Sequence, residues 1–142
     1  QRQMCIRDST YFGYGPIESY PDKHHDAKLG LYTSDVDSLH EDYLRPQENG
    51  SHWNCSGLAL TTSDHRSLLI SGTQNFSFNA SRYTQEELTT KAHSFELEKS
   101  PYTVLCLDGY MSGCGSNSCG PALAKKYRVD QDKLTFTFTL NF

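Results

Sequence analysis

Alternation of apolar and hydroxyl side chains near the C-terminal end is the sequence feature that most restricts the fold. Leucine or phenylalanine stands at every second position from Leu134 to Leu140, and threonine stands between them. A period of two puts all the apolar side chains on one face of an extended strand, whereas a helix would scatter them around its axis. The sequence therefore predicts a strand over 134–140 and a fold built mostly of β-sheet.

Further strands are predicted where short apolar runs end at turn residues. These segments are 54–61, with Leu58 and Leu60 on one face, 67–71, 75–79, and a buried strand at 101–107 that contains Cys106. One short helix is predicted at 84–93, where Thr84 and Glu87 form a capping box and Lys91 and His93 suit its C-terminal end. The stretch 11–50 is rich in glycine, proline, aspartate and tyrosine, and we expect it to be mostly loop.

The first residues differ from the rest of the chain. Residues 1–9 show neither helical nor strand periodicity, and the string QRQMCIRDS resembles translated sequencing-adapter sequence. We therefore expect 1–10 to be a non-native or disordered segment and 11–142 to be the folded domain, in a chain truncated at its N-terminus.

Composition excludes several classes of protein. The 142 residues include 36% hydrophobic and 21% charged residues, which fits one globular domain and argues against disorder or a coiled coil. With a net charge of −4 and no basic cluster, the chain lacks what nucleic-acid binding requires, and no apolar run is long enough to span a bilayer. The five cysteines form no disulfide-scaffold pattern, so we expect a reducing, cytoplasmic compartment.

Histidines, carboxylates and a cysteine are the candidates for chemistry. The histidines follow no metal-ligand spacing, so we expect surface residues and no metal site. Glu18 and Glu48 lie in similar loops and suit a pair of glycosidase carboxylates, although loop carboxylates more often bind backbone N–H groups or basic side chains. Cys119 would need a histidine base to act as a nucleophile, and a loop cysteine without a catalytic role is the commoner case.

Aromatic side chains are frequent in the predicted loops. They could stack on pyranose rings or close the open ends of a sandwich, and the sequence leaves both possibilities open. These aromatic residues are Tyr11, Phe12, Tyr14, Tyr20, Tyr32, Tyr43 and Trp53.

Four segments, in order and spacing, carry a family signature. They are 11–23 (YFGYGPIESYPDK), 43–50 (YLRPQENG), 76–84 (FSFNASRYT) and 107–121 (LDGYMSGCGSNSCGP). Together they resemble the C-terminal domain of the β-galactosidases of glycoside hydrolase family 2, which is also called the small chain. The resemblance extends from residue 11 to residue 142.

This resemblance implies the C-terminal half of a β-supersandwich, similar to the galactose mutarotase fold. In the family, the catalytic glutamates and the main metal ligands lie in a separate TIM-barrel region. The resemblance therefore implies no catalytic residue in this chain, and Mg²⁺ and Na⁺ in the missing region rather than here. The implied partners are that catalytic region, in the same or a separate chain, and a galactoside, in an oligomer without nucleic acid or membrane.

The resemblance also points to one loop as a substrate-binding segment. Family members carry a tryptophan platform in the loop that reaches the active site, and the matching residues here are Asn117, Ser118 and Cys119. With cysteine at that position, we expect the loop to line the wall of the pocket. The implied function is part of a β-galactosidase that hydrolyses terminal non-reducing β-D-galactose residues. The alternatives are a non-catalytic carbohydrate-binding β-sandwich and an aldose epimerase-like supersandwich protein.

Overall fold

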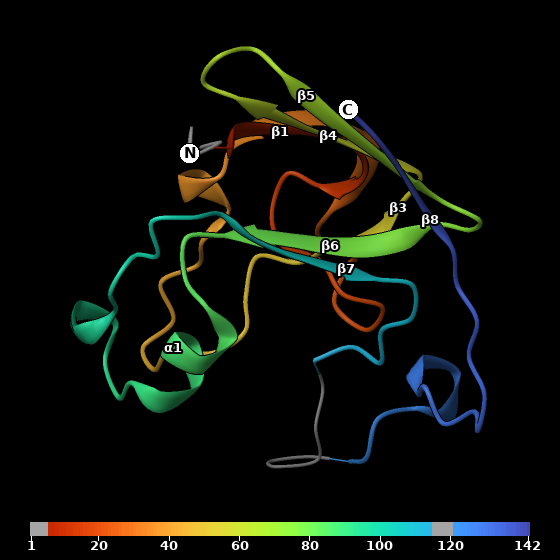
Figure 1. The fold of residues 1–142 in the computed structure, drawn as a ribbon. Helices are drawn as coiled ribbons and strands as arrows, with labels where there is room; N and C mark the ends of the chain where they lie inside the picture. The colour runs from red at the N-terminus through yellow and green to blue at the C-terminus, as the bar shows by residue number, and fades with distance from the viewer. Residues whose placement is uncertain (1–5, 115–120) are drawn as a thin grey trace.

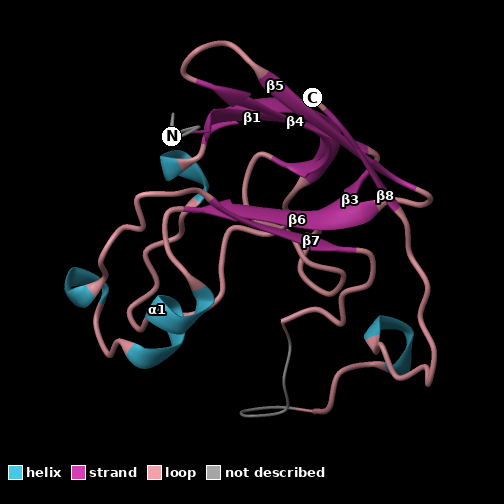
Figure 2. Cartoon of the chain, viewed as in Figure 1, coloured by secondary structure: helices cyan, strands magenta, loops and turns pink. Residues whose placement is uncertain are grey.

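Two antiparallel sheets face each other in the computed structural model, which describes residues 6–114 and 121–142 (Figure 1). The larger sheet has the strand order β2 (Lys28–Asp35), β1 (Ile6–Gly15), β4 (Gly57–Thr62), β5 (Ser67–Gly72), β8 (Phe138–Asn141). The smaller has the order β3 (His52–Cys55), β6 (Phe76–Ser81), β7 (Val104–Asp108). Figure 2 shows the helical part of the described residues, which is α1 (Gln85–Thr90) and the 3₁₀ turns η1 (Asp37–Leu39), η2 (Ser94–Glu96) and η3 (Lys125–Tyr127). The prediction of a mostly β fold with one short helix is confirmed.

The core lies between the inner faces of the two sheets. Leu58 and Leu60 of β4 are almost completely buried, as their spacing predicts, and Phe76 and Phe78 of β6 oppose them from the smaller sheet. Burial of each such side chain contributes about 1.5–3 kcal/mol to folding. Tyr11, Val36, Leu39, Cys55, Ile70 and Ala80 complete the buried cluster.

The predicted strand over 54–61 is two strands in different sheets. Asn54, inside β3, has a φ of +59° where the pairing of β3 with β6 shifts register, and β4 begins three residues later at Gly57. The backbone N–H of Ser56 then donates to the carbonyl of Phe12 at 3.0 Å. The apolar pattern gives the correct face for β4 but cannot show that the chain changes sheets at this point.

Most of 11–50 lies outside strands, as predicted, but the segment also contains the end of β1 and all of β2, which the prediction missed. β1 and β2 pair without interruption from Asp8–Asp35 to Gly15–Lys28. The glycines that suggested a loop are needed inside this hairpin, because a Cβ atom on Gly13 would collide with the Sγ of Cys55. Small residues allow β1 to pass close to the corner that leads from β3 to β4.

The start of the fold also differs from the predicted boundary at residue 11. β1 begins at Ile6, which pairs with Thr62, and Ser9 is completely buried. The polar residues of this segment show no apolar alternation, so the sequence does not predict the strand. Buried Ser9 is tolerated there because its hydroxyl donates to the carbonyl of Ser34. The non-native origin of the first residues stays a prediction.

The C-terminal strand is shorter than its alternation predicts. Only Phe138–Asn141 pairs with β5, while the carbonyl of Thr137 accepts a hydrogen bond from the Thr73 N–H before the ladder begins. Phe136 and Phe138 pack against the core, but Leu134 and Leu140 are exposed by 41% and 48%. Alternation therefore predicts the face of each residue but not how far the pairing extends.

Two further predictions need adjustment. β7 is half-buried throughout, including Cys106, because it pairs with β6 and has no second partner strand among the described residues. The strand predicted as buried is thus the outer strand of the smaller sheet. In α1, the Thr84 hydroxyl accepts from the Glu87 N–H at 3.1 Å, as predicted, but the helix ends at Thr90, before Lys91 and His93.

Candidate functional site

A buried carboxylate, Glu18, organises the loops beyond the end of β1. Its side chain is only 4% exposed and receives hydrogen bonds on both oxygens. Oε1 accepts from Lys23 Nζ at 2.5 Å and from the Tyr43 hydroxyl. Oε2 accepts from the Gly50 N–H at 2.8 Å and from the Tyr20 hydroxyl at 3.3 Å. One carboxylate thus joins two loops that are distant in sequence. The first contains Glu18, Tyr20 and Lys23, and the second contains Tyr43 and Gly50.

The electrostatics of this cluster favour an ionised Glu18. Burial by itself would raise the pKa of this carboxyl, but donation from Lys23, Tyr43 and Gly50 outweighs burial and holds the pKa below its usual value. Burial acts to lower the pKa of Lys23, and the bonds to Glu18 and Tyr43 reverse this and raise it. Glu18 therefore carries no proton to give at neutral pH, and its oxygens are already engaged, so it is not equipped to act as a general acid or a nucleophile.

Backbone geometry places the second loop against Glu18. Gly50 has a φ of +70°, and a Cβ atom there would collide with the carbonyl of Leu39. The Asn49 side chain accepts from the Glu41 N–H at 3.0 Å, and the Asn79 amide donates to the Asn49 carbonyl. These contacts fix the Gly50 N–H in position to donate to Glu18.

A third loop is tied to the same cluster through Asp22. The Asp22 carboxylate accepts a hydrogen bond from the Cys114 N–H at 3.0 Å. Gly113, which has a φ of +87°, lies so close to Asp22 that a Cβ atom would collide with the carboxylate. The Ser51 hydroxyl contacts Met111 Sδ at 3.7 Å. The residues just before 115–120 are therefore fixed to the loop that carries Glu18.

The structure tests some of the predictions about site residues and not others. Asn117, Ser118 and Cys119 lie outside the described residues, so their proposed role stays a prediction. Glu18 confirms the interpretation of a loop carboxylate that binds a backbone N–H and a lysine. Glu48 is exposed. The two glutamates thus lie in different environments, and the hydrogen bonds of Glu18 hold the loops together.

The expectation of surface histidines is wrong for His52. This side chain is 1% exposed, its Nδ1 lies 2.9 Å from the Tyr11 hydroxyl, and its Nε2 has no hydrogen-bond partner. Burial lowers the pKa of His52 to about 4, so the ring is neutral at pH 7. The sequence does not predict the burial of His52, because a single histidine next to Trp53 belongs to no apolar pattern with a strand or helix period. Among the described residues, no group of three or more His, Cys, Asp or Glu side chains is arranged to hold a metal ion.

Aromatic residues divide between the core and a half-exposed cluster. Tyr11 and Tyr20 are buried, so their rings are not available to stack on a sugar. Tyr14 and His24 both contact the Trp53 ring, with centroid distances of 5.1 Å and 4.5 Å. This cluster lies next to the loop of Glu18, because the backbone N–H of Trp53 donates to the Ser19 hydroxyl at 2.9 Å.

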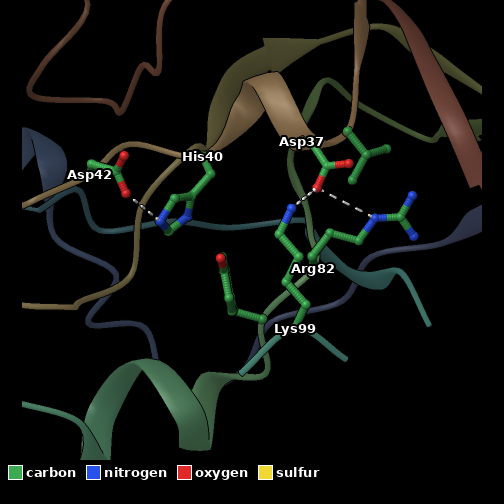
Figure 3. A pocket seen from close by; sticks show the side chains of 7 residues that line it. Asp37, His40, Asp42, Arg82 and Lys99 are labelled. Atoms are coloured by element: carbon green, nitrogen blue, oxygen red, sulfur yellow. Dashed lines mark hydrogen bonds and ion pairs between the residues drawn. The ribbon is translucent and has the colours of Figure 1, made fainter. Parts of the chain in front are cut away.

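A small polar pocket of about 200 Å³ lies next to η1 (Figure 3). Asp37 pairs with Lys99 at 2.8 Å and with Arg82 at 3.8 Å, and His40 Nε2 lies 3.4 Å from Asp42. Figure 3 shows these two groups on opposite sides of the opening. Acidic and basic side chains neutralise each other, so the pocket offers no charge excess for an ionic ligand.

Three signature loops converge on Glu18 and Asp22, and the region that is similar to known proteins contains all three. Residues 3–140 match the family model for the β-galactosidase small chain. The chain belongs to this family. No helix of the described small-chain domain is long and apolar enough to cross a bilayer.

Several β-galactosidases are similar to this small-chain domain. The enzyme from Actinobacillus pleuropneumoniae is 52% identical over 132 residues, which is 93% of this chain and 13% of the relative. Those from Staphylococcus xylosus and Oenococcus oeni are 36% and 33% identical, over 93% and 94% of the chain and again 13% of each relative. The chain thus corresponds to 13% of the length of these relatives.

Proposed function

We propose that this chain is a non-catalytic part of a β-galactosidase that hydrolyses terminal non-reducing β-D-galactose residues, as in lactose. The match of residues 3–140 to the small-chain family is the observation that carries this proposal. Relatives that are 30% or more identical over nearly the whole chain are named β-galactosidase.

The chemistry of the assembled enzyme needs two carboxyl groups, one to protonate the leaving oxygen and one to form the glycosyl intermediate in a retaining mechanism. The state of Glu18 supports the proposal that both come from another region. It is ionised and bound to Lys23 and Gly50, and its proposed role is to hold two loops together.

We propose that Asn117, Ser118 and Cys119 line the wall of the galactoside pocket. The attachment of a residue that closely precedes them in the chain supports this role, because Asp22 accepts a hydrogen bond from the Cys114 N–H. A thiol presents a smaller face to a pyranose ring than an indole does. Cys119 therefore contributes shape rather than stacking to the pocket.

The partners and conditions follow from the same proposal. The chain joins a TIM-barrel catalytic region, in the same or a separate polypeptide, in an oligomeric enzyme. Mg²⁺ and Na⁺ bind in that region and supply charge stabilisation there. A cytoplasmic location is supported by Cys55, Cys106 and Cys114, which are free thiols.

Assays of a chromogenic β-galactoside test the division of labour. The isolated chain should show no turnover. A chimera, in which this chain replaces the matching 132 residues of the A. pleuropneumoniae enzyme, should be active. Turnover by the repurified isolated chain that disappears in Glu18→Gln would contradict the non-catalytic role. A folded chimera without turnover would contradict participation in a β-galactosidase.

Substitution in the same chimera tests the pocket wall. Cys119→Trp should change kcat/KM for lactose and for an aryl galactoside, because an indole adds a stacking surface worth about 1 kcal/mol. Cys119→Ser is the matched control and should have little effect. Unchanged kinetics in a well-folded Cys119→Trp chimera would remove this loop from the pocket.

A further inference from the structure

The polar pocket next to η1 is lined by three segments that are far apart in the chain. They are 36–42, which contains η1, 82–83, which follows β6, and Lys99, which lies in the segment before β7. The volume of about 200 Å³ is below that of pockets that hold drug-sized ligands, so the cavity suits a single small molecule.

Hydrogen bonds hold the wall that carries Arg82 and Lys99 in place. Two guanidinium nitrogens of Arg82 donate at 2.9 Å, Nη1 to the Thr103 hydroxyl and Nη2 to the carbonyl of Ile6. The carbonyl of Arg82 accepts from the Ser100 N–H at 2.7 Å, and this bond keeps the neighbouring Lys99 at the pocket. These contacts lie within the chain, so the pocket is formed before any ligand arrives.

The ionised side chains of the pocket balance in charge but keep unfilled hydrogen-bonding capacity. They are Asp37, Asp42, Arg82 and Lys99. Asp37 Oδ1 accepts from Lys99 Nζ at 2.8 Å, whereas Asp37 Oδ2 has no hydrogen-bond partner among the residues that the structure describes. An ammonium group has three N–H donors, and Lys99 uses one of them on Asp37. Donors and acceptors therefore stand side by side at the pocket without a net charge.

The other side of the opening combines polar and aromatic groups. His40 Nε2 lies 3.4 Å from Asp42 Oδ1, and His40 Nδ1 is enclosed without a hydrogen-bond partner in the described part of the chain. The rings of His40 and Tyr83 are in contact, with their centroids 4.7 Å apart. Figure 3 shows His40 and Asp42 across the opening from Asp37. A ligand in this pocket would meet aromatic surface as well as charged groups.

These features select one class of ligand. Two carboxylates would repel an anion such as phosphate, and Arg82 and Lys99 would repel a divalent cation. A neutral polyol meets neither penalty, because each hydroxyl both donates and accepts and can bind a carboxylate and an ammonium group together. A pyranose ring also has an apolar C–H face, which packs on an aromatic ring.

We propose that this pocket binds one neutral hexopyranose. Its hydroxyl groups bind Asp37, Asp42 and Lys99, and its ring packs against the aromatic pair of His40 and Tyr83. The proposal goes beyond the proposed function, because the loop proposed there to contact the galactoside takes no part. No bond is made or broken in this pocket, so the chain has a sugar-binding site that is complete within itself.

Titration of the isotope-labelled 142-residue chain with D-galactose and with D-glucose tests this proposal, with NMR shifts of the backbone amides as the readout. Amides of 37–42, 82–83 and Lys99 should shift together and saturate with a Kd of about 1–10 mM, the range for a small ligand with few contacts. Sodium phosphate should give no saturating shift at the same amides. Absence of saturable shifts there with both sugars, or tighter binding of phosphate than of either sugar, overturns the proposal.

Variants separate this pocket from non-specific sugar binding. Lys99→Met and Asp42→Ala each remove a polar group whose side chain is largely exposed, so the fold should survive. Each should weaken sugar binding about five- to tenfold, because hydroxyl groups lose a charged partner. Lys133→Met and Asp130→Ala are the matched controls, since both residues are exposed and neither lines the pocket. Unchanged affinity in both pocket variants, or an equal loss in the controls, overturns the proposal.

The A. pleuropneumoniae chimera described above replaces the isolated chain if the latter gives a poorly dispersed spectrum. Hydrogen–deuterium exchange of peptides that cover 36–42 and 82–83 should slow severalfold in about 100 mM D-glucose, because ligand binding opposes local opening. The Lys99→Met chimera should show weaker slowing. Exchange that D-glucose and D-galactose leave unchanged in these peptides overturns the proposal. A chimera that shows the expected protection but hydrolyses no galactoside contradicts the proposed function and leaves the sugar site standing.

Discussion

The Asp22 carboxylate accepts a hydrogen bond from the backbone N–H of Cys114, although 92 positions separate the two residues in the chain. Asp22 lies next to Lys23, which binds the buried Glu18, so the contact transmits the position of one loop to another. The same carboxylate leaves no room for a side chain at Gly113. Asp22 therefore fixes the position of residues 113 and 114 relative to the loop that carries Glu18.

Replacement of Asp22 should change the reactivity of the Cys114 thiol. Burial raises the pKa of this thiol, and the negative charge of Asp22 raises it further. Asp22→Asn keeps an oxygen that can accept from the Cys114 N–H but removes the charge. Alkylation of Cys114 at pH 8, followed by peptide mass spectrometry, should become severalfold faster because the thiolate is more populated.

Cys106 is the internal control for this measurement. Its pKa is raised by burial and by Asp108, and Asp22 does not contribute to it. Its alkylation rate should be the same in both proteins. Equal acceleration at both cysteines would indicate general loosening, and an unchanged rate at Cys114 would show that Asp22 does not influence it electrostatically.

Gly113→Ala should destabilise the domain, whereas Gly57→Ala should not. An alanine at a φ of +87° is strained, and its methyl group would push against Asp22. We expect a loss of about 1–3 kcal/mol in the free energy of unfolding by urea. Gly57 has open space around it, so its substitution should change stability by less than about 0.5 kcal/mol in the isolated chain. Similar losses at both positions would contradict the contact with Asp22.

Glu18→Gln should cost stability without any effect on catalytic chemistry in this chain. The amide cannot satisfy Lys23 and the Gly50 N–H as the carboxylate does, so a partly buried charge loses its partner. Because the Lys23 side chain is 41% exposed and can reach water, we expect a loss of about 2 kcal/mol rather than more.

Glu48→Gln is the matched control for Glu18→Gln, since Glu48 is an exposed glutamate in a similar loop. Its free energy of unfolding should stay within about 0.5 kcal/mol of the parent value. The difference between the two variants is the quantity to measure. If Glu18→Gln were as stable as Glu48→Gln, the cluster would not contribute to the fold.

Sequence patterns predicted the faces of strands well but their boundaries poorly. Leu58 and Leu60 are buried as expected, since a period of two survives in any sheet. The positive φ of Asn54 and the close approach of Gly13 to Cys55 depend on contacts between strands, and no local pattern encodes such contacts. This is why one predicted strand is two, and why the paired strands β1 and β2 were missed within a segment that is otherwise loop.

In the candidate site, too, local features could be predicted from the sequence and contacts between distant segments could not. Glycines, asparagine and a lone aspartate in the signature segments suggested loops, which is correct for Gly50 and Gly113. Their convergence on Glu18 and Asp22 involves hydrogen bonds between residues far apart in sequence. Only the family resemblance indicated that these segments act together, and the structure supplies the physical reason.

Buried His52 should make the stability of the domain depend on pH between about 6.5 and 4. Its pKa in the folded protein is lowered from 6.5 to about 4 by burial. The unfolded chain therefore binds a proton at a pH where the folded chain does not, and stability falls as pH decreases. The expected slope is about 1.4 kcal/mol per pH unit, with a total loss of roughly 3 kcal/mol that levels off below pH 4.

Urea unfolding at several pH values between 7 and 4.5 measures this slope. His52→Gln retains a group that can accept from the Tyr11 hydroxyl but does not titrate, so this variant should be less stable at pH 7 and lose the slope assigned to His52. His65→Asn is the control, because His65 is exposed and its φ of +63° suits asparagine. Glu18 has a lowered pKa, so its contribution is lost only as pH falls below its usual value and through the folded pKa. If His52→Gln kept the full slope of the parent chain, the pH dependence would have to come from groups other than His52.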